Sequence, residues 1–224
     1  MPRLLDIVQR PAEAAQRCKH VLYNPAERVS HFDEALAASI RDLIATMHHE
    51  QGIGIAAPQV GWPLQIFIIQ AEIESPRYPL LRRYPDLKNV AQQIFINPRI
   101  TAASTETIGY WHGCLSGKGH ERGLLRTYRS ISFAAQDCQG LSFEGTLDSL
   151  GAIIFQHEFR HLLGTIYYDH AKDFLSLDQL LEKTKEGTVQ LYTAQPDLKI
   201  PHMLADYRVG ESIEDYKKRQ EPPR

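Results

Sequence analysis

The chain has 224 residues, a formal net charge of −2 and 43% hydrophobic residues, a composition typical of a globular protein with a sizeable core. The near-neutral net charge argues against a strongly basic surface that binds nucleic acid and against an acidic tail. No run of about 18 apolar residues occurs, so no membrane span is expected. The 3 cysteines are too few for a disulfide framework, and with no apolar leader segment they predict a cytoplasmic protein.

The first half of the chain predicts one helix and two strands. Apolar side chains at helical spacing predict a helix over residues 31–50. The β-branched run at 64–70 predicts a buried strand. Residues 71–92 are polar and rich in proline, so an irregular excursion is expected there. A short strand at 93–96 is expected to stop at Asn97-Pro98.

The second half predicts a strand, a turn and one well-defined helix. Residues 130–135 predict the strand, and residues 138–140 predict a turn before 141–143. The helix is expected to begin near Asp148. Gly164 is expected to cap its carboxyl end, because glycine readily adopts the left-handed conformation of that position.

The C-terminal part is more polar. A short strand is expected at 166–168, with short helices at 175–184 and 212–220. Because strands mostly precede one central helix, the predicted class is α+β, with antiparallel or mixed β-sheets packed around that helix. We expect one domain over 1–170 and a partly helical extension over 171–224 that packs on it.

The pentapeptide at 157–161 reads HEFRH and is the most informative segment. Residues four apart share a helix face, so His157 and His161 can bind one metal ion, with Glu158 beside them as a general base. The apolar residues on the same face are Leu150, Ile153 and Ile154. Both imidazoles therefore point inward, where an unpartnered polar group is costly. The segment indicates a hydrolytic metal centre, with a pair of core histidines as the alternative.

Two further segments carry chemistry that is ambiguous by itself. Cys114 lies in a Gly-Cys-Leu-Ser run, which taken alone indicates a loop with a small buried cysteine. The segment 52–61 has two alternate glycines and paired alanines, which predict that the backbone closely approaches a ligand. A phosphate or a peptide-like molecule would fit, although the Lys-Ser/Thr of a phosphate loop is absent.

Taken together, the three segments resemble the peptide deformylase family, whose motifs GxGxAAxQ, EGCLS and HExDH occur in that order. This chain reads GIGIAAPQ at 52–59, HGCLS at 112–116 and HEFRH at 157–161, and the similarity extends over about residues 35–170. The resemblance implies a deformylase-like fold. It also implies an enzyme that removes the N-formyl group from the N-terminal methionine of newly made polypeptides, with metal-bound water as the nucleophile.

The resemblance further implies a set of metal ligands. Cys114, His157 and His161 would hold one divalent ion, with Fe²⁺ expected ahead of Zn²⁺ and Ni²⁺. Glu158 would act as general base and then protonate the leaving amine. The side-chain amide of Gln59 would stabilise the developing oxyanion together with the backbone N–H of the residue after the cysteine. That residue is Leu115.

The implied substrate is an N-formyl-methionyl peptide, met at the ribosome by a monomer or weak dimer. Ile53 and Gly54 would pair with its backbone as an added strand. The residues expected to wall the methionine pocket are Leu150, Ile153 and Ile154. Two alternatives use the same scaffold: another metallo-amidase or protease, and a peptide-binding homologue without turnover.

Four positions depart from the family pattern. His112 stands in place of a glutamate, Arg160 in place of an aspartate, and Gly117-Lys118 in place of an apolar residue and a proline. Glu121 stands where many members carry an arginine, whereas Arg126 matches the family. The lost acids are expected to orient the ligands and neutralise Arg126. We therefore hypothesise that Glu121 pairs with Arg160 or Arg126 in a rearranged shell, with tolerated changes at exposed positions as the alternative.

Overall fold

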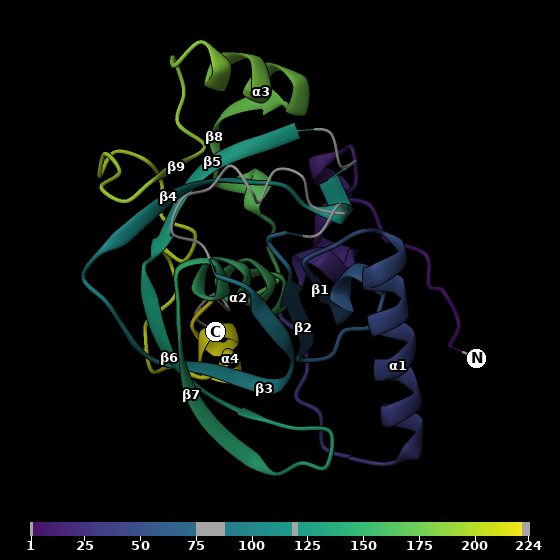
Figure 1. The fold of residues 1–224 in the computed structure, drawn as a ribbon. Helices are drawn as coiled ribbons and strands as arrows, with labels where there is room; N and C mark the ends of the chain where they lie inside the picture. The colour runs from purple at the N-terminus through teal and green to yellow at the C-terminus, as the bar shows by residue number, and fades with distance from the viewer. Residues whose placement is uncertain (1, 75–87, 118–120, 221–224) are drawn as a thin grey trace.

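Two antiparallel sheets enclose a central helix, α2 (Ser149–Leu162), as Figure 1 shows. The computed structural model describes residues 2–74, 88–117 and 121–220. In strand order, the first sheet is β1 (Gly54–Ala56), β2 (Ile66–Ala71), β3 (Val90–Ala103), β6 (Ser130–Gln136) and β7 (Ser142–Asp148). The second is β8 (Lys172–Ser176), β5 (Glu121–Tyr128), β4 (Thr107–His112) and β9 (Tyr192–Thr193). The predicted α+β class is confirmed.

Three further helices lie around this core (Figure 1). They are α1 (Glu34–His49), α3 (Leu177–Lys185) and α4 (Ile213–Gln220). All three match predicted helices. In the described part of the chain, none of the helices has the length and apolar character needed to cross a membrane.

Helix α2 is buried on every face. Each of its residues is buried, although its sequence shows only one apolar stripe. The reason is that strands of both sheets contact it, while the C-terminal segment covers a further side, where the ring of Tyr207 lies 5.0 Å from that of Phe159. Polar residues on α2 must therefore find partners within the protein.

Strand β3 corrects one prediction. The short strand expected at 93–96 instead continues through Asn97-Pro98 to Ala103. The pairing register shifts between Ile96 and Arg99, and Asn97 has a φ of 51°. A bulge of this kind accommodates a proline without ending the strand. The Asn97 side chain also accepts from Val29 N at 2.8 Å and donates to Val29 O at 2.9 Å, which anchors the bulge.

The segment after α2 corrects another. The strand expected at 166–168 is instead the short 3-10 helix Tyr167–Asp169. The Tyr167 hydroxyl donates to the carbonyl of Glu121 at 3.0 Å, so this turn packs against β5 through side chains and not through a strand ladder. The prediction also omits β1, β4, β5, β8 and β9. Of the excursion expected at 71–92, residues 75–87 lie outside the described residues.

Gly164 is required at the end of α2. Its φ is +77°, and a Cβ there would lie 2.5 Å from the carbonyl carbon of Asn24 and 2.6 Å from the nitrogen of Pro25. We expect Gly164→Ala to lower the free energy of unfolding by about 2–4 kcal/mol, because it combines left-handed strain with a backbone clash. Urea unfolding measures this.

Gly187 provides the matched control. Its φ is +73°, but a Cβ there would meet nothing within 4 Å. Gly187→Ala is therefore expected to cost only the left-handed penalty of about 1 kcal/mol. Equal losses in the two variants would show that the contact with Asn24 is unimportant.

The C-terminal helices α3 and α4 contribute side chains to the same core as α2. The main core cluster includes Phe155 and Phe159 of α2 together with Leu180 of α3 and Tyr216 of α4. The long segment between α3 and α4 also contributes Met203, Leu204 and Tyr207. The C-terminal chain thus contributes side chains to the core and is packed against it.

Candidate metal centre

The structure brings the three predicted ligands together. Cys114 follows the end of β4, just before the 3-10 helix Leu115–Gly117, while His157 and His161 lie one turn apart on α2. One donor atom from each of the three lies within 4.8 Å of the others. The Cys114 Sγ and the His161 Nε2 are 3.4 Å apart. All three side chains are buried, so the cluster is a compact set of one sulfur and two nitrogen donors.

The protonation states of these donors fit a divalent ion. Burial lowers the pKa of His157 to about 4 and that of His161 well below its usual range, so both imidazoles keep a free lone pair at neutral pH. Burial raises the pKa of the Cys114 thiol to about 12, and a bound cation would reverse this by favouring the thiolate. One thiolate and two imidazoles are a common donor set for Zn²⁺ and related transition metals.

His112 takes the place of the motif glutamate and contacts a ligand directly. Its Nδ1 lies 3.2 Å from the Nδ1 of His157, and the two rings stack at 14° with centroids 5.4 Å apart. If His157 binds an ion through Nε2, its Nδ1 carries the proton and donates a hydrogen bond to the Nδ1 of His112. His112 would then orient His157 as a neutral imidazole, a task that carboxylates or carbonyls perform in most metal sites.

Glu158 sits against the glycine-rich segment. It is 4% exposed, and burial raises its pKa well above the usual range. A Cβ on Gly54 would come 2.8 Å from the carboxyl carbon of Glu158, so glycine is needed there for α2 to approach β1. Among the described residues, no partner bonds to the Glu158 Oε2 atom. This oxygen remains available to exchange a proton.

Gln59 directs its amide toward the cysteine. It lies in the 3-10 helix Ala57–Val60, where its Oε1 accepts from Ala56 N at 2.8 Å. Its Nε2 lies 3.4 Å from the Cys114 Sγ and 3.4 Å from the Ser116 Oγ. The side chain is 2% exposed, so its donor is fixed in orientation.

Leu115 follows the cysteine directly and begins the 3-10 helix. Its carbonyl accepts a hydrogen bond from the Gln9 Nε2 at 3.0 Å. The N-terminal segment therefore holds the loop that carries the predicted oxyanion donor. The sequence contained no signal for this contact, because the two residues are 106 positions apart.

Strand β1 lies at the edge of its sheet. It pairs with β2, and no described strand lies on its other side. The Ile53 carbonyl accepts from Gln70 N at 2.9 Å. Main-chain polar groups alternate in direction along a strand, so those of Gly54 face the open edge.

The three apolar residues predicted for the methionine pocket lie on α2 within the main core cluster. Leu150 and Ile153 are each 1% exposed, and Ile154 is 3% exposed. Their helix face is the one that carries His157 and His161. They are therefore apolar neighbours of the metal cluster on the same element.

The hypothesis about Glu121 is wrong. Arg160 is 1% exposed and forms its ion pair with Asp206, in the C-terminal segment. Glu121 instead accepts from the Tyr168 hydroxyl, and Arg126 donates its Nε to a backbone carbonyl at 2.8 Å. Arg160 and Glu121 do not pair because their side chains lie in different places. Arg160 projects from α2 toward the C-terminal segment, whereas Glu121 lies at the start of β5 beside Tyr168.

Sequence reasoning also missed the role of Asp206. A general signal was present, since a buried arginine needs an anion. However, the chain contains 27 acidic residues, and nothing in their local patterns selects position 206. The contact between His112 and His157 was missed for the same reason, because it joins two separate elements.

Sequence comparison finds similarity to known deformylases. The family model described as polypeptide deformylase matches residues 6–176. Peptide deformylase 2 of Pseudomonas putida is 39% identical over 135 residues, which cover 60% of this chain and 71% of that protein. A peptide deformylase of Leptospira biflexa is 35% identical over 133 residues, covering 59% of this chain and 70% of that protein.

Solved structures show the same similarity. A class I type b peptide deformylase from Acinetobacter baumannii, bound to Met-Ala-Ser, matches with a TM-score of 0.64 at 28% identity. The match covers 75% of this chain and 99% of that chain. The peptide deformylase from Thermotoga maritima matches with a TM-score of 0.62 at 28% identity, covering 76% and 99%.

Proposed function

The chain belongs to the polypeptide deformylase family, and from this premise we propose how its own residues remove the N-formyl group from nascent peptides. The observation that carries the proposal is the convergence of Cys114, His157 and His161, with Glu158 beside them. The overall reaction adds water to the formamide and yields formate and a free amine. Each residue below is assigned one task in that reaction.

Cys114, His157 and His161 would hold a single divalent ion, which we propose to be Fe²⁺; the donor set also accepts Zn²⁺ and Ni²⁺. When bound, this ion supplies Lewis-acid activation of water and of the formyl carbonyl. His112 would keep the ring of His157 in its binding orientation through the contact between their Nδ1 atoms.

Glu158 would move the proton. Burial favours the protonated acid, but a bound cation nearby would favour the ionised form. We assign this carboxylate to accept a proton from the attacking water and return it to the nitrogen of the leaving amine. Its support is its place next to His157 and the exclusion of bulk water, since the side chain is 4% exposed. Because Gly54 has no Cβ, the Glu158 carboxylate can occupy the space beside it.

Gln59 and Leu115 would stabilise the negative charge that develops on the formyl oxygen. The Gln59 Nε2 already faces the Cys114 sulfur, and the main-chain N–H of Leu115 is the next donor after the cysteine. Preorganised donors of this kind stabilise an oxyanion by about 2.7–4 kcal/mol each.

The substrate peptide would add to the open edge of β1. Ile53 and Gly54 would pair with its backbone, and Gly54 presents its polar groups on that edge. The methionine side chain would pack toward the α2 face that bears the ligands. The residues proposed to wall it are Leu150, Ile153 and Ile154.

The domain organisation, location and assembly are also proposals. We place one catalytic domain at 1–170 and a packed extension at 171–224, supported by the core residues that both contribute. Free thiols at Cys114 and Cys138 support a reducing, cytoplasmic setting. All proposed site residues come from one chain, which supports a monomer or weak dimer. Action at the ribosome is supported because the substrate arises there.

Formate release tests the function. Protein loaded with Fe²⁺ without oxygen is expected to release formate from an N-formyl-Met peptide, and to leave the matched N-acetyl-Met peptide intact. Formate is measured with a coupled dehydrogenase. Cleavage of both peptides would indicate a broader amidase. Binding of the formyl peptide with no formate, at one equivalent of metal, would indicate a peptide-binding homologue and contradict the proposal.

A further inference from the structure

We propose that Asp206 is a positioning residue for the metal centre. The C-terminal segment 200–220, which lies beyond the family match, would deliver its carboxylate to the buried Arg160 and so hold the last turn of α2 in place. This inference rests on the proposed function only in taking Cys114, His157 and His161 as ligands. It assigns the C-terminal extension a task in the site.

Arg160 is a buried cation inside the metal-binding helix. It lies between Glu158 and His161 and is 1% exposed. Its Nη1 pairs with the Asp206 carboxylate, and its Nη2 lies 3.4 Å from the second carboxylate oxygen. Its Nη2 also contacts the Nε2 of His170. Within the described residues, Asp206 is the acid that neutralises this charge, and a buried cation without its anion is strongly unfavourable.

Asp206 is itself held in a defined orientation. The Tyr216 hydroxyl donates to its Oδ2 at 2.7 Å, and Arg219 donates to its main-chain carbonyl at 2.8 Å. Arg219 is fixed in turn by an ion pair with Glu211 at 2.5 Å. Burial alone would raise the pKa of Asp206, but the hydrogen bond and charge of Arg160 lower it, so the carboxylate stays ionised. The carboxylate is thus preorganised to receive Arg160.

The segment that carries Asp206 is tied to both sheets. Met203 N donates to the carbonyl of Arg126 on β5 at 2.9 Å. Gly210 N donates to the carbonyl of Ile100 on β3 at 2.9 Å. These hydrogen bonds fix the segment that carries the Asp206 carboxylate. Through its ion pair with Arg160, this segment helps to set the position of α2 relative to the sheets.

His161 is the residue next to Arg160 on the same helical turn. Without the Asp206 carboxylate, the buried Arg160 guanidinium would move toward solvent and rotate this turn. That rotation would displace the His161 Nε2 from the Cys114 Sγ, which lies 3.4 Å from it. Metal ligands must be held within about 0.5 Å of their productive positions. Loss of groups that orient ligands typically weakens metal binding by about 10–100-fold.

The test uses Co²⁺ on the full chain, because its visible spectrum reports the ligand geometry without any turnover. Asp206→Asn is expected to weaken Co²⁺ binding by about 10-fold in a chelator competition and to shift the thiolate bands. Adding Arg160→Met removes the stranded charge and is expected to restore most of the affinity and the spectrum. Asp215→Asn, an exposed acid on α4, is the matched control and should leave both unchanged.

A milder variant guards against loss of folding. Tyr216→Phe keeps the charge pair but removes the hydroxyl from the Asp206 Oδ2, and a loss of about 2- to 5-fold in Co²⁺ affinity is expected, as for one hydrogen bond of roughly 0.5–1 kcal/mol. Native Co²⁺ affinity in Asp206→Asn, or a double variant as weak as the single one, would overturn the inference. Formate release by the parent protein tests the function separately, since Co²⁺ affinity does not depend on turnover.

Discussion

Glu158→Gln is expected to lower the rate of formate release by about 10²–10⁴-fold, the usual contribution of a general acid–base group. Glutamine keeps the volume and most contacts of the side chain but cannot accept a proton from water. Binding of one metal equivalent should survive, because the proposed ligands are Cys114, His157 and His161. Turnover is measured as formate release, and metal content by elemental analysis of the same sample.

The control for this variant is Glu144→Gln on β7, where the side chain is exposed and is not among the proposed site residues. Its turnover should match the parent protein. If Glu158→Gln instead lost its metal together with its activity, Glu158 would have a structural task, and the assignment of proton transfer would be wrong.

Cys114→Ser is expected to weaken binding of the divalent ion by at least about 100-fold, since replacing a ligand costs more than replacing a group that only orients one. A serine hydroxyl is a poor ligand because it rarely ionises near neutral pH, whereas a cation readily stabilises a thiolate. Activity should fall in parallel with bound metal. Chelator competition and elemental analysis provide the measurement.

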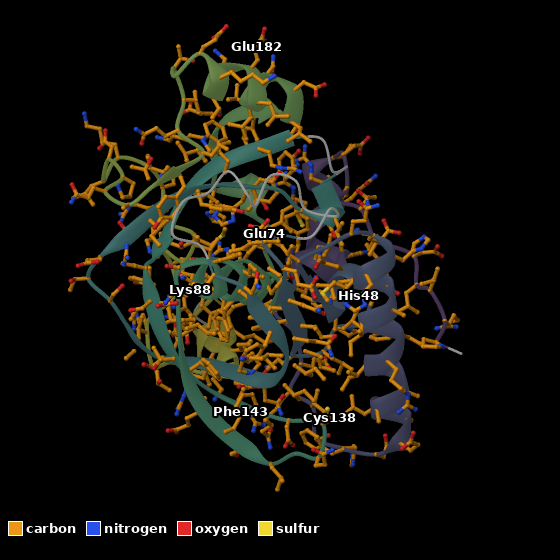
Figure 2. The ribbon with its side chains drawn as sticks, in the orientation of Figure 1. His48, Glu74, Lys88, Cys138, Phe143 and Glu182 are labelled. Atoms are coloured by element: carbon orange, nitrogen blue, oxygen red, sulfur yellow. The ribbon has the colours of Figure 1, made fainter. Side chains whose placement is uncertain are left out.

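Cys138→Ser is the matched control for this substitution. Cys138 is a free, partly buried cysteine at the turn after β6, and Figure 2 labels it near the end of the β6–β7 hairpin. It packs against the smaller core cluster that includes residues of α1, whereas Cys114 belongs to the main cluster. Unchanged metal binding is expected there. Full metal retention in Cys114→Ser would show that the sulfur is not a ligand.

Local patterns predicted the elements on which the chemistry stands. Helix α1, strand β2 and helix α2 follow from the spacing of apolar side chains, which depends only on neighbouring residues. The pairing of His157 with His161 follows in the same way, because residues four apart always share a helix face. Order along the chain, together with the three motifs, added Cys114 to that pair.

Local sequence patterns gave wrong secondary-structure predictions where contacts with distant segments determine the conformation. The strand through Asn97-Pro98 persists because the Asn97 side chain bonds to Val29, 68 positions away, and that contact outweighs the local tendency of proline to end a strand. The turn at Tyr167 packs on β5 for a similar reason. Neither partner is visible in the residues around the element itself.

Local spacing in the sequence predicted His157, His161 and Glu158 as candidate ligands and general base, because they lie on one helix a few residues apart. The family resemblance added Cys114, which lies outside that helix, and the reaction class. What surrounds these groups depends on the tertiary structure. It placed His112 against His157 and gave the buried Arg160 its anion from Asp206, 46 positions away. A buried charge demands some partner, which is a local requirement, but the fold of the whole chain selects which of many acids meets it.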